Sequence, residues 1–142
     1  MTAYATILAA LQGDTTLAGI LTGGLYDGTE INDISRQATP AAYDQYSELL
    51  PCAIVKPETQ APAGPHPDSS RLFVTIWFYQ QSGSAEIDAA RIRAYHLLHR
   101  ATLGGSDGLW DVRHANDLLG IELQALGVPA IMSRYVATEN RG

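Results

Sequence analysis

The sequence has 142 residues, of which 46% are hydrophobic and 17% charged, and its formal net charge is −6. This hydrophobic content is enough for a folded core and excludes wholesale disorder, while the acidic excess is the opposite of the balance typical of duplex-binding modules. The single cysteine, Cys52, excludes an intramolecular disulfide framework and a thiolate zinc cage.

A chain of this length predicts a single domain spanning residues 1–142. The first four residues carry no basic side chain, so we expect no signal peptide. No apolar run approaches the roughly 20 residues of a membrane span. The low charged fraction indicates that a partner covers part of the surface.

The N-terminal segment predicts two short helices. The first has apolar residues at helical spacing, namely Tyr4, Ile7, Leu8 and Leu11. Gly13 interrupts it, and Asp14 is a good N-cap for a second helical turn that carries Leu17, Ile20 and Leu21. A short extended piece, Leu25-Tyr26, follows the two glycines at 23–24 and ends at the Asp27-Gly28 turn signal.

The middle of the chain predicts a long hairpin. Residues 28–50 carry little pattern, although Pro40 favours a short helix that continues through Leu50. Cys52–Lys56 and Arg71–Tyr79 are strand-like, and the second is the strongest strand signal in the chain. The proline-rich segment 57–69 between them predicts a wide, stiff loop, which is either an ordinary surface loop or an arm that orders against another subunit.

The second half predicts one long helix followed by strands. Ser84 is the expected N-cap, and a buried stripe is formed by Ile87, Ala90, Ala94, Leu97, Leu98 and Ala101. Three short strands are expected at Leu109–His114, Leu118–Leu123 and Ala130–Ala137. The predicted fold class is α+β: an antiparallel sheet with a long hairpin, packed against one long helix and short N-terminal helices.

No residue cluster predicts catalysis, a metal site or a cofactor. His96 and His99 share a helix face without further metal ligands, which favours a solvated helix end. Cys52 lies in an apolar strand and lacks a nucleophile signature, so we expect it to be buried and structural. The glycine-rich residues 104–108 follow a helix instead of preceding one, which favours a helix stop over a phosphate loop. The chain is therefore not expected to be an enzyme.

The strand at 71–79 has two apolar faces. Leu72, Val74, Ile76 and Phe78 form an ordinary core face. The opposite face carries Phe73, Trp77 and Tyr79, and it too must be covered, either by a helix of the same chain or by a neighbouring subunit. Tyr43 and Tyr46 add aromatic surface nearby in the sequence. We therefore predict that Phe73, Trp77, Tyr79, Tyr43 and Tyr46 contribute to a subunit or partner interface.

Several sequence pieces occur in an order that resembles a known family. They are Leu17–Leu21, Gly24–Gly28, Pro51–Val55, Phe73–Phe78 and the helix with Ala89–Ile92 and Leu97-Leu98. Together they resemble the tail completion family of long-tailed bacteriophages, the tail terminator or head-to-tail joining proteins. The resemblance covers roughly residues 15–138 and rests on the order of elements. The segment between Asp27 and Pro51 is longer than the usual pattern, and residues 57–69 are unusually rich in proline.

The resemblance implies a structural role in the virion, at the head-tail junction of a phage made in the host cytoplasm. Such proteins form a homo-oligomeric ring, commonly a hexamer, that ends tail tube growth and joins the tail tube protein to the head-tail connector protein. DNA passes transiently through the lumen, and the family has no catalytic, metal or cofactor residues. Two alternatives remain open: a head-side adaptor or minor tail protein, and a small α+β enzyme or ligand-binding domain.

Overall fold

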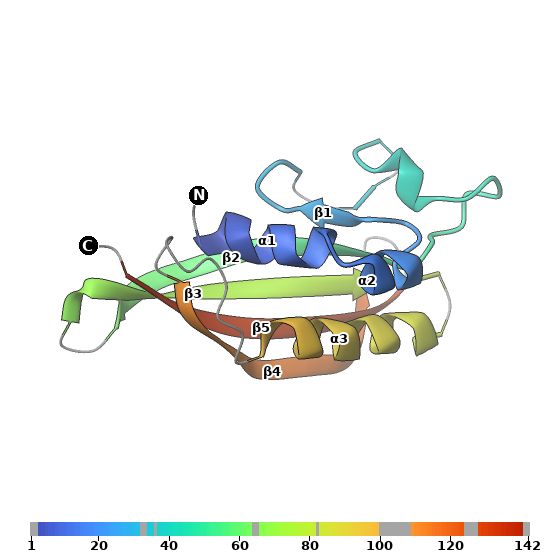
Figure 1. The fold of residues 1–142 in the computed structure, drawn as a ribbon. Helices are drawn as coiled ribbons and strands as arrows, with labels where there is room; N and C mark the ends of the chain where they lie inside the picture. The colour runs from blue at the N-terminus through green and yellow to red at the C-terminus, as the bar shows by residue number, and fades with distance from the viewer. Residues whose placement is uncertain are drawn as a thin grey trace.

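A computed structural model describes residues 3–31, 34–35, 37–63, 66–81, 83–99, 109–123 and 128–140 (Figure 1). Its helices are α1 (Ala3–Gln12), α2 (Thr15–Ile20) and α3 (Ala85–Leu98), with a 3-10 turn at Pro40–Ala42. Its strands are β1 (Leu25–Asp27), β2 (Cys52–Ala63), β3 (His66–Tyr79), β4 (Leu109–Leu123) and β5 (Val128–Asn140). None of the helices in these ranges is long and apolar enough to cross a membrane.

The strands form one five-stranded sheet in the order β1-β2-β3-β5-β4. Every neighbouring pair is antiparallel except β1 and β2, which run parallel with Tyr26 opposite Ile54. The predicted α+β class is confirmed, and the sheet is mixed because of this one parallel edge pair. The return from β1 to a parallel neighbour is made by the long segment 28–50, consistent with the length that parallel connections need.

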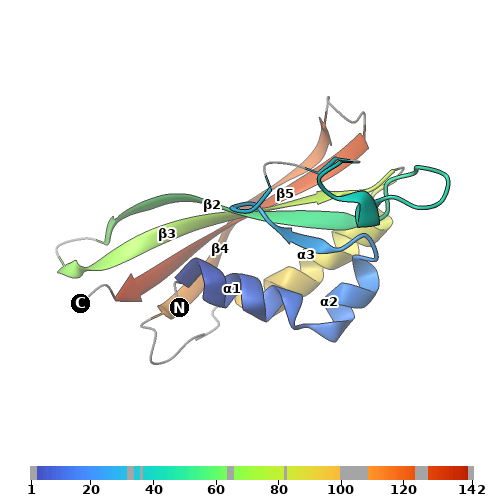
Figure 2. The ribbon, with the colours of Figure 1, turned by 90° about the horizontal axis from the view of Figure 1, so that it is seen from above.

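The segment 57–69 is largely strand, not the loop that its prolines predict. β2 continues to Ala63 and β3 begins at His66. The register shifts between Pro57 and Gln60 and between Pro62 and Ala63, and such irregularities are where a strand tolerates proline. Figures 1 and 2 show this end of the hairpin projecting beyond α1.

The predicted strands 109–114 and 118–123 are one strand, β4. Its polar middle keeps its pairing with β5 because register shifts follow His114 and Leu118 and absorb extra residues. β5 also extends beyond the predicted 130–137. Polar residues in an edge strand resemble a turn in the sequence because one side of the strand, backbone and side chains alike, faces water.

The N-terminal helices end and begin as predicted. Asp14 caps α2, since its Oδ2 accepts a hydrogen bond from the Leu17 backbone N at 2.8 Å. The same carboxylate receives two bonds from Arg93 on α3, at 2.9 and 2.7 Å, so one side chain joins the two helices. Arg93 also lowers the pKa of Asp14 to about 2.

The start of α3 is capped differently from the prediction. Ser84 occupies the N-cap position, but its side chain makes no cap hydrogen bond. Gln80, at the end of β3, supplies the cap through its Oε1, which accepts from the Ile87 backbone N at 3.0 Å. The predicted buried stripe is confirmed at Ile87, Ala90, Ala94 and Leu98, while Leu97 is partly buried and Ala101 lies outside the described residues.

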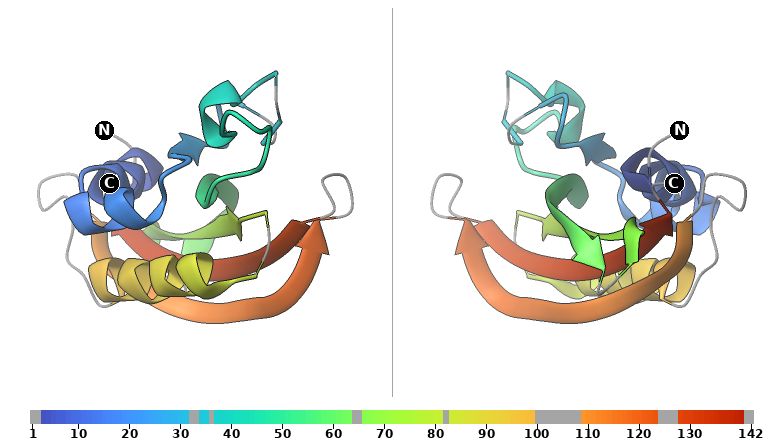
Figure 3. Two further views of the ribbon diagram at one scale, coloured as in Figure 1. Left: turned by 90° about the vertical axis from the view of Figure 1, so that its right-hand side faces the viewer. Right: turned by 90° about the vertical axis from the view of Figure 1, so that its left-hand side faces the viewer.

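The segment 28–50 is mostly irregular, and the predicted helix through Leu50 is limited to Pro40–Ala42. Beyond that turn, Tyr43 pairs with Leu49 in an isolated β-bridge, so the chain doubles back instead of continuing as a helix. Figures 2 and 3 show this segment on one side of β1 and β2 and the helices on the other.

The core has two parts, one on each face of the sheet. The helix-side cluster joins α1, α2 and α3 to the predicted core face of β3, where Val74, Ile76 and Phe78 are fully buried. The opposite cluster packs Ile34, Ala42 and Leu49 from the segment 28–50 onto Cys52, Ile54 and Tyr79. The second apolar face of β3 is thus covered at one end by an irregular segment of the same chain, and not by a helix.

Candidate functional site

Tyr79 and Tyr43 belong to the core on the segment side. Tyr79 is only 2% exposed and lies in the opposite cluster with Leu49 and Ala130. Tyr43 is half-buried against the same cluster. Both tyrosine side chains therefore pack against residues of their own chain.

Trp77 and Phe73 lie farther along the same face, where the covering segment ends. Trp77 is half-buried and packs against the edge of the opposite cluster. Phe73 is half-buried beneath Arg134 of β5, whose guanidinium carbon lies 4.5 Å from the ring centroid. Arg134 Nε is also 3.6 Å from Glu58 Oε2. Among the described residues, long side chains such as Arg134 and Glu58 lie over this part of the face, and the half-buried Phe73 and Trp77 leave ring surface for a partner.

Tyr46 is the most exposed of the five predicted residues, at 76%. It lies at the tip of the loop between Tyr43 and Leu49, which the Asp44 side chain organises. Asp44 Oδ1 accepts hydrogen bonds from the backbone N of Tyr46 at 2.8 Å and of Glu48 at 3.0 Å. Ser47 adopts a φ of 62°, a left-handed conformation that a serine rarely takes. The loop is therefore held in one shape with its aromatic side chain in solvent.

Sequence reasoning missed several exposed apolar side chains, on the edge strand β4 and on α3. Leu118 and Leu119 on β4 are 47% and 60% exposed, and Ile92 and Tyr95 on α3 are also exposed. α3 and β4 are neighbours, joined by the ion pair between Arg91 and Asp117. The adjacent leucines are the sequence signal, since two consecutive residues in a strand point to opposite faces and an edge strand cannot bury both; here neither enters the core.

A polar network under α3 contains a serine, a histidine and an aspartate. Asp117 Oδ1 accepts from Ser133 Oγ at 2.7 Å and lies 2.8 Å from His114 Nε2, while Asp117 Oδ2 accepts from Arg91 at 2.9 Å. Burial raises the pKa of Asp117, but these hydrogen bonds outweigh it and hold the pKa below its usual range. His99 Nδ1 accepts from the His114 backbone N at 3.0 Å and its ring stacks on Tyr95.

This network is not arranged as a nucleophile and base. Ser133 and His114 both face the same oxygen of Asp117, whereas catalysis needs the histidine between the other two. Ser133 is also 0% exposed, so no substrate reaches its hydroxyl. The network instead ties α3 to β4 and β5. It also corrects the expectation for His99, which is half-buried, while His96 is exposed as predicted.

In the part of the chain that the structure describes, we find no metal site and no accessible thiol. No group of three histidine, cysteine, aspartate or glutamate side chains is placed to hold a metal ion in those ranges. Cys52 is buried as predicted, and burial raises the pKa of its thiol to about 12. The glycine-rich residues 104–108 lie outside the described residues.

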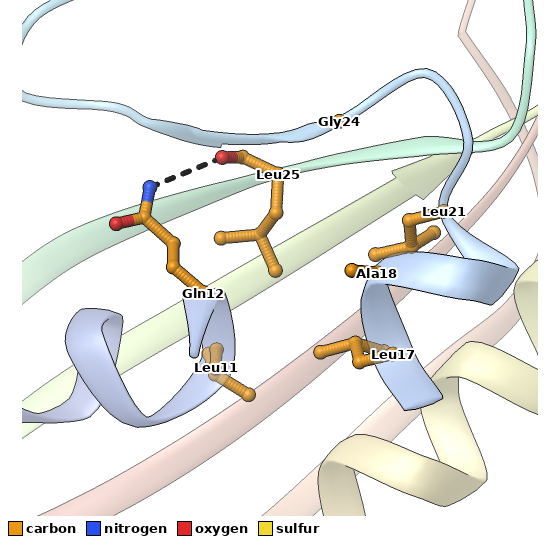
Figure 4. A pocket seen from close by; sticks show the side chains of 7 residues that line it. All are labelled: Leu11, Gln12, Leu17, Ala18, Leu21, Gly24 and Leu25. Atoms are coloured by element: carbon orange, nitrogen blue, oxygen red, sulfur yellow. Dashed lines mark hydrogen bonds between the residues drawn. The ribbon is translucent and has the colours of Figure 1, made fainter. Parts of the chain in front are cut away.

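A pocket of about 270 Å³ lies between α1, α2 and the start of β1 (Figure 4). Its walls are mainly apolar, with Leu11, Leu17, Leu21 and Leu25 facing it, and Gln12, Ala18 and Gly24 complete the lining. The Gln12 amide spans one side, donating from Nε2 to the Leu25 carbonyl at 3.2 Å. Gln12 and Ala18 are exposed, so the pocket opens to the surface.

No family model matches the sequence, and no curated protein matches it. The fold is similar to that of a chain in the solved structure described as "Virion of native gene transfer agent (GTA) particle". That likeness has a TM-score of 0.72 at 17% sequence identity, and it covers 98% of this chain and 95% of that chain. At this identity the two chains share a fold.

Proposed function

We propose that this protein is a structural component of a virion, a single tail-terminator-like domain (residues 1–142) that assembles into a ring at the head-proximal end of a phage tail. The observation that carries the proposal is the fold likeness to a chain of a virion particle over almost the whole of both chains. It agrees with the resemblance of the sequence to the tail completion family, which rests on the order of the same elements.

Surface chemistry supports self-assembly. Exposed leucines on the β4 edge strand and an incompletely covered aromatic face at Phe73 and Trp77 are apolar areas that water does not favour. Leu118 pairs with Met132, and Met132 pairs with Trp77, so the exposed leucine and the half-buried aromatic residues belong to one face of the sheet. A heterologous contact made by this face closes into a ring when the rotation between copies closes.

The ring is proposed to be a hexamer that ends tail tube polymerisation and joins the tube to the head connector. DNA then passes through its lumen. The net charge of −6 suits this conduit, because a lumen that transmits DNA should repel it and not retain it. Reversing the charge of lumen-facing acids should slow DNA ejection, and unchanged ejection would remove this part of the proposal.

Native mass spectrometry over a concentration series, with and without purified tail tubes, tests the proposal. We expect a discrete hexamer in solution or a capped tube end after mixing. A tight symmetric dimer that neither grows nor caps tubes would contradict it. Binding to the portal-side connector but not to the tube would favour the head-side adaptor role instead.

A further inference from the structure

We propose that Tyr46 of one subunit inserts into the pocket between α1 and α2 of the next subunit. The inference rests on the proposed function, because it names a contact between neighbouring copies of this chain, beyond the apolar areas described above, that contributes most to joining them. It pairs two surface features of the described residues, an aromatic side chain in solvent and a small, mainly apolar pocket.

The first half of the contact is a preformed projection. The Asp44 carboxylate fixes the loop, and the Tyr43–Leu49 bridge closes its base. Leu49 anchors that base through hydrogen bonds with Gln81 in both directions, at 2.9 and 3.0 Å. A side chain presented by an ordered loop loses little conformational entropy on binding, and tyrosine is among the residues that most often dominate interface energies.

The second half is a receptor of matching size and chemistry. Leucine side chains surround the pocket, and its volume of about 270 Å³ accommodates one phenol ring. The Gln12 amide at its edge offers a polar group to the tyrosine hydroxyl, as an aromatic residue with one apolar body and one polar tip requires. Charged residues do not line the pocket, so burying the ring there desolvates no charge.

Placement makes the contact intermolecular. The pocket lies with α1 and α2 on one side of β1 and β2, whereas the loop that carries Tyr46 lies on the other side (Figures 2 and 3). Leu49 and Leu50 hold the loop in place, since the Leu50 backbone N also donates to the Ala42 carbonyl at 2.8 Å. Tyr46 therefore cannot enter the pocket of its own chain. A tyrosine on one side and a pocket on the other define a heterologous contact, which builds a ring when the rotation between copies closes.

Two variants break the contact from its two halves. Tyr46→Ala removes the tyrosine ring, and Ala18→Trp fills the pocket from its exposed rim. Each should weaken self-association by roughly 30-fold or more, as expected for a hot-spot side chain. Gln45→Ala, at the exposed neighbouring position of the same loop, is the matched control and should assemble like the unmodified chain. Circular dichroism and thermal melting check that every variant is folded.

Mixing the two variants gives the sharper test. Each alone should be monomeric in sedimentation or native mass spectrometry, because every contact lacks one half. An equimolar mixture should form heterodimers and nothing larger, since the Ala18→Trp copy still has Tyr46 and the Tyr46→Ala copy still has an open pocket. A mixture that stays monomeric, or a Tyr46→Ala chain that assembles normally, would overturn the contact between Tyr46 and the pocket.

A covalent trap tests the same contact where association is weak. The double variant Gln45→Cys with Ala18→Cys keeps Tyr46 in place and should form covalent multimers larger than dimers under mild oxidation, while each single variant should not. Absence of multimers at high protein concentration would overturn the contact. The proposed function fails separately: it is contradicted if the unmodified chain neither forms a ring nor caps tail tubes, whatever the cysteine variants do.

Discussion

The two faces of the sheet are covered in different ways. Three helices cover the first face, and its β3 side chains Val74, Ile76 and Phe78 are inaccessible to solvent. On the second face the irregular segment 28–50 packs near Tyr79, and Thr75 is buried, but Trp77 and Phe73 are only half-buried. The comparison teaches that the first face stabilises the monomer along its whole length, whereas the second leaves the half-buried Trp77 and Phe73 available for the proposed assembly.

Substitutions at neighbouring positions of β3 separate these roles most strongly. Phe78→Ala should lower the free energy of unfolding by about 3–5 kcal/mol, because it leaves a cavity under the helices. Trp77→Ala should cost only about 1–2 kcal/mol, since its side chain is half-buried. Urea unfolding of both variants measures the difference. Equal losses would mean that the second face is an ordinary core face.

Self-association should depend more on Trp77 than on Phe78, the reverse of the order expected for stability. A folded Trp77→Ala chain should associate less well than the unmodified protein if this part of the face is an interface. Sedimentation at a concentration where the unmodified chain is oligomeric provides the measurement. Normal stability together with normal assembly would remove Trp77 from both roles.

The polar network under α3 allows a second test of the comparison, because it links α3 to the first face of the sheet. Asp117→Ala removes the acceptor shared by Ser133, His114 and Arg91, and it leaves the buried Ser133 hydroxyl without this partner. We expect a loss of about 2–3 kcal/mol in the free energy of unfolding. Asp88→Ala is the control, because that carboxylate binds the same arginine at a more exposed site. A loss from Asp88→Ala as large as that from Asp117→Ala would show that the network is not the link between α3 and the sheet.

The regular face could be predicted from the sequence, and the irregular one could not. Alternation in β3 and helical spacing in α3 predict that Phe78 and Ile87 lie in the core, and the structure buries both side chains. The segment 28–50 has no period, so its cover of Tyr79 depends on long-range packing that no local pattern encodes. The prolines at 57 and 62 predicted a loop, but the strand continues through them. Register shifts, which the sequence does not reveal, accommodate both prolines.

The candidate site was predicted in part for the same reason. Aromatic character predicted an interface at Tyr46, Trp77 and Tyr79 alike, but it could not distinguish the exposed Tyr46 and half-buried Trp77 from Tyr79, which the same chain buries. The sequence does not predict the pocket, because its lining residues come from α1, α2 and β1, and only the folded chain brings these elements together. The same holds for Asp117, whose partners lie on two other elements.

A smaller effect is expected from Tyr135, the largest side chain buried on the helix side. Its hydroxyl is buried and has no hydrogen-bond partner among the described residues. Tyr135→Phe removes an unsatisfied polar group and keeps the ring, so it should raise the free energy of unfolding by about 1 kcal/mol. Thermal melting of this variant measures the gain. A marked loss would mean that the hydroxyl has a role in the native state.

The smallest expected effect tests whether the helices are held to each other as well as to the sheet. Arg93 lowers the pKa of Asp14 to about 2 in the folded chain, against about 3.9 in an unfolded one. A carboxylate with a depressed pKa stabilises the fold above its unfolded pKa, and that contribution is lost as the pH falls from about 4 towards 2. Arg93→Ala should therefore be less stable than the unmodified chain at pH 7, and the difference should shrink over this acidic window. Urea unfolding of both proteins between pH 7 and pH 2 measures it. A difference that stays constant across the window would mean that Arg93 acts through packing and not through its charge.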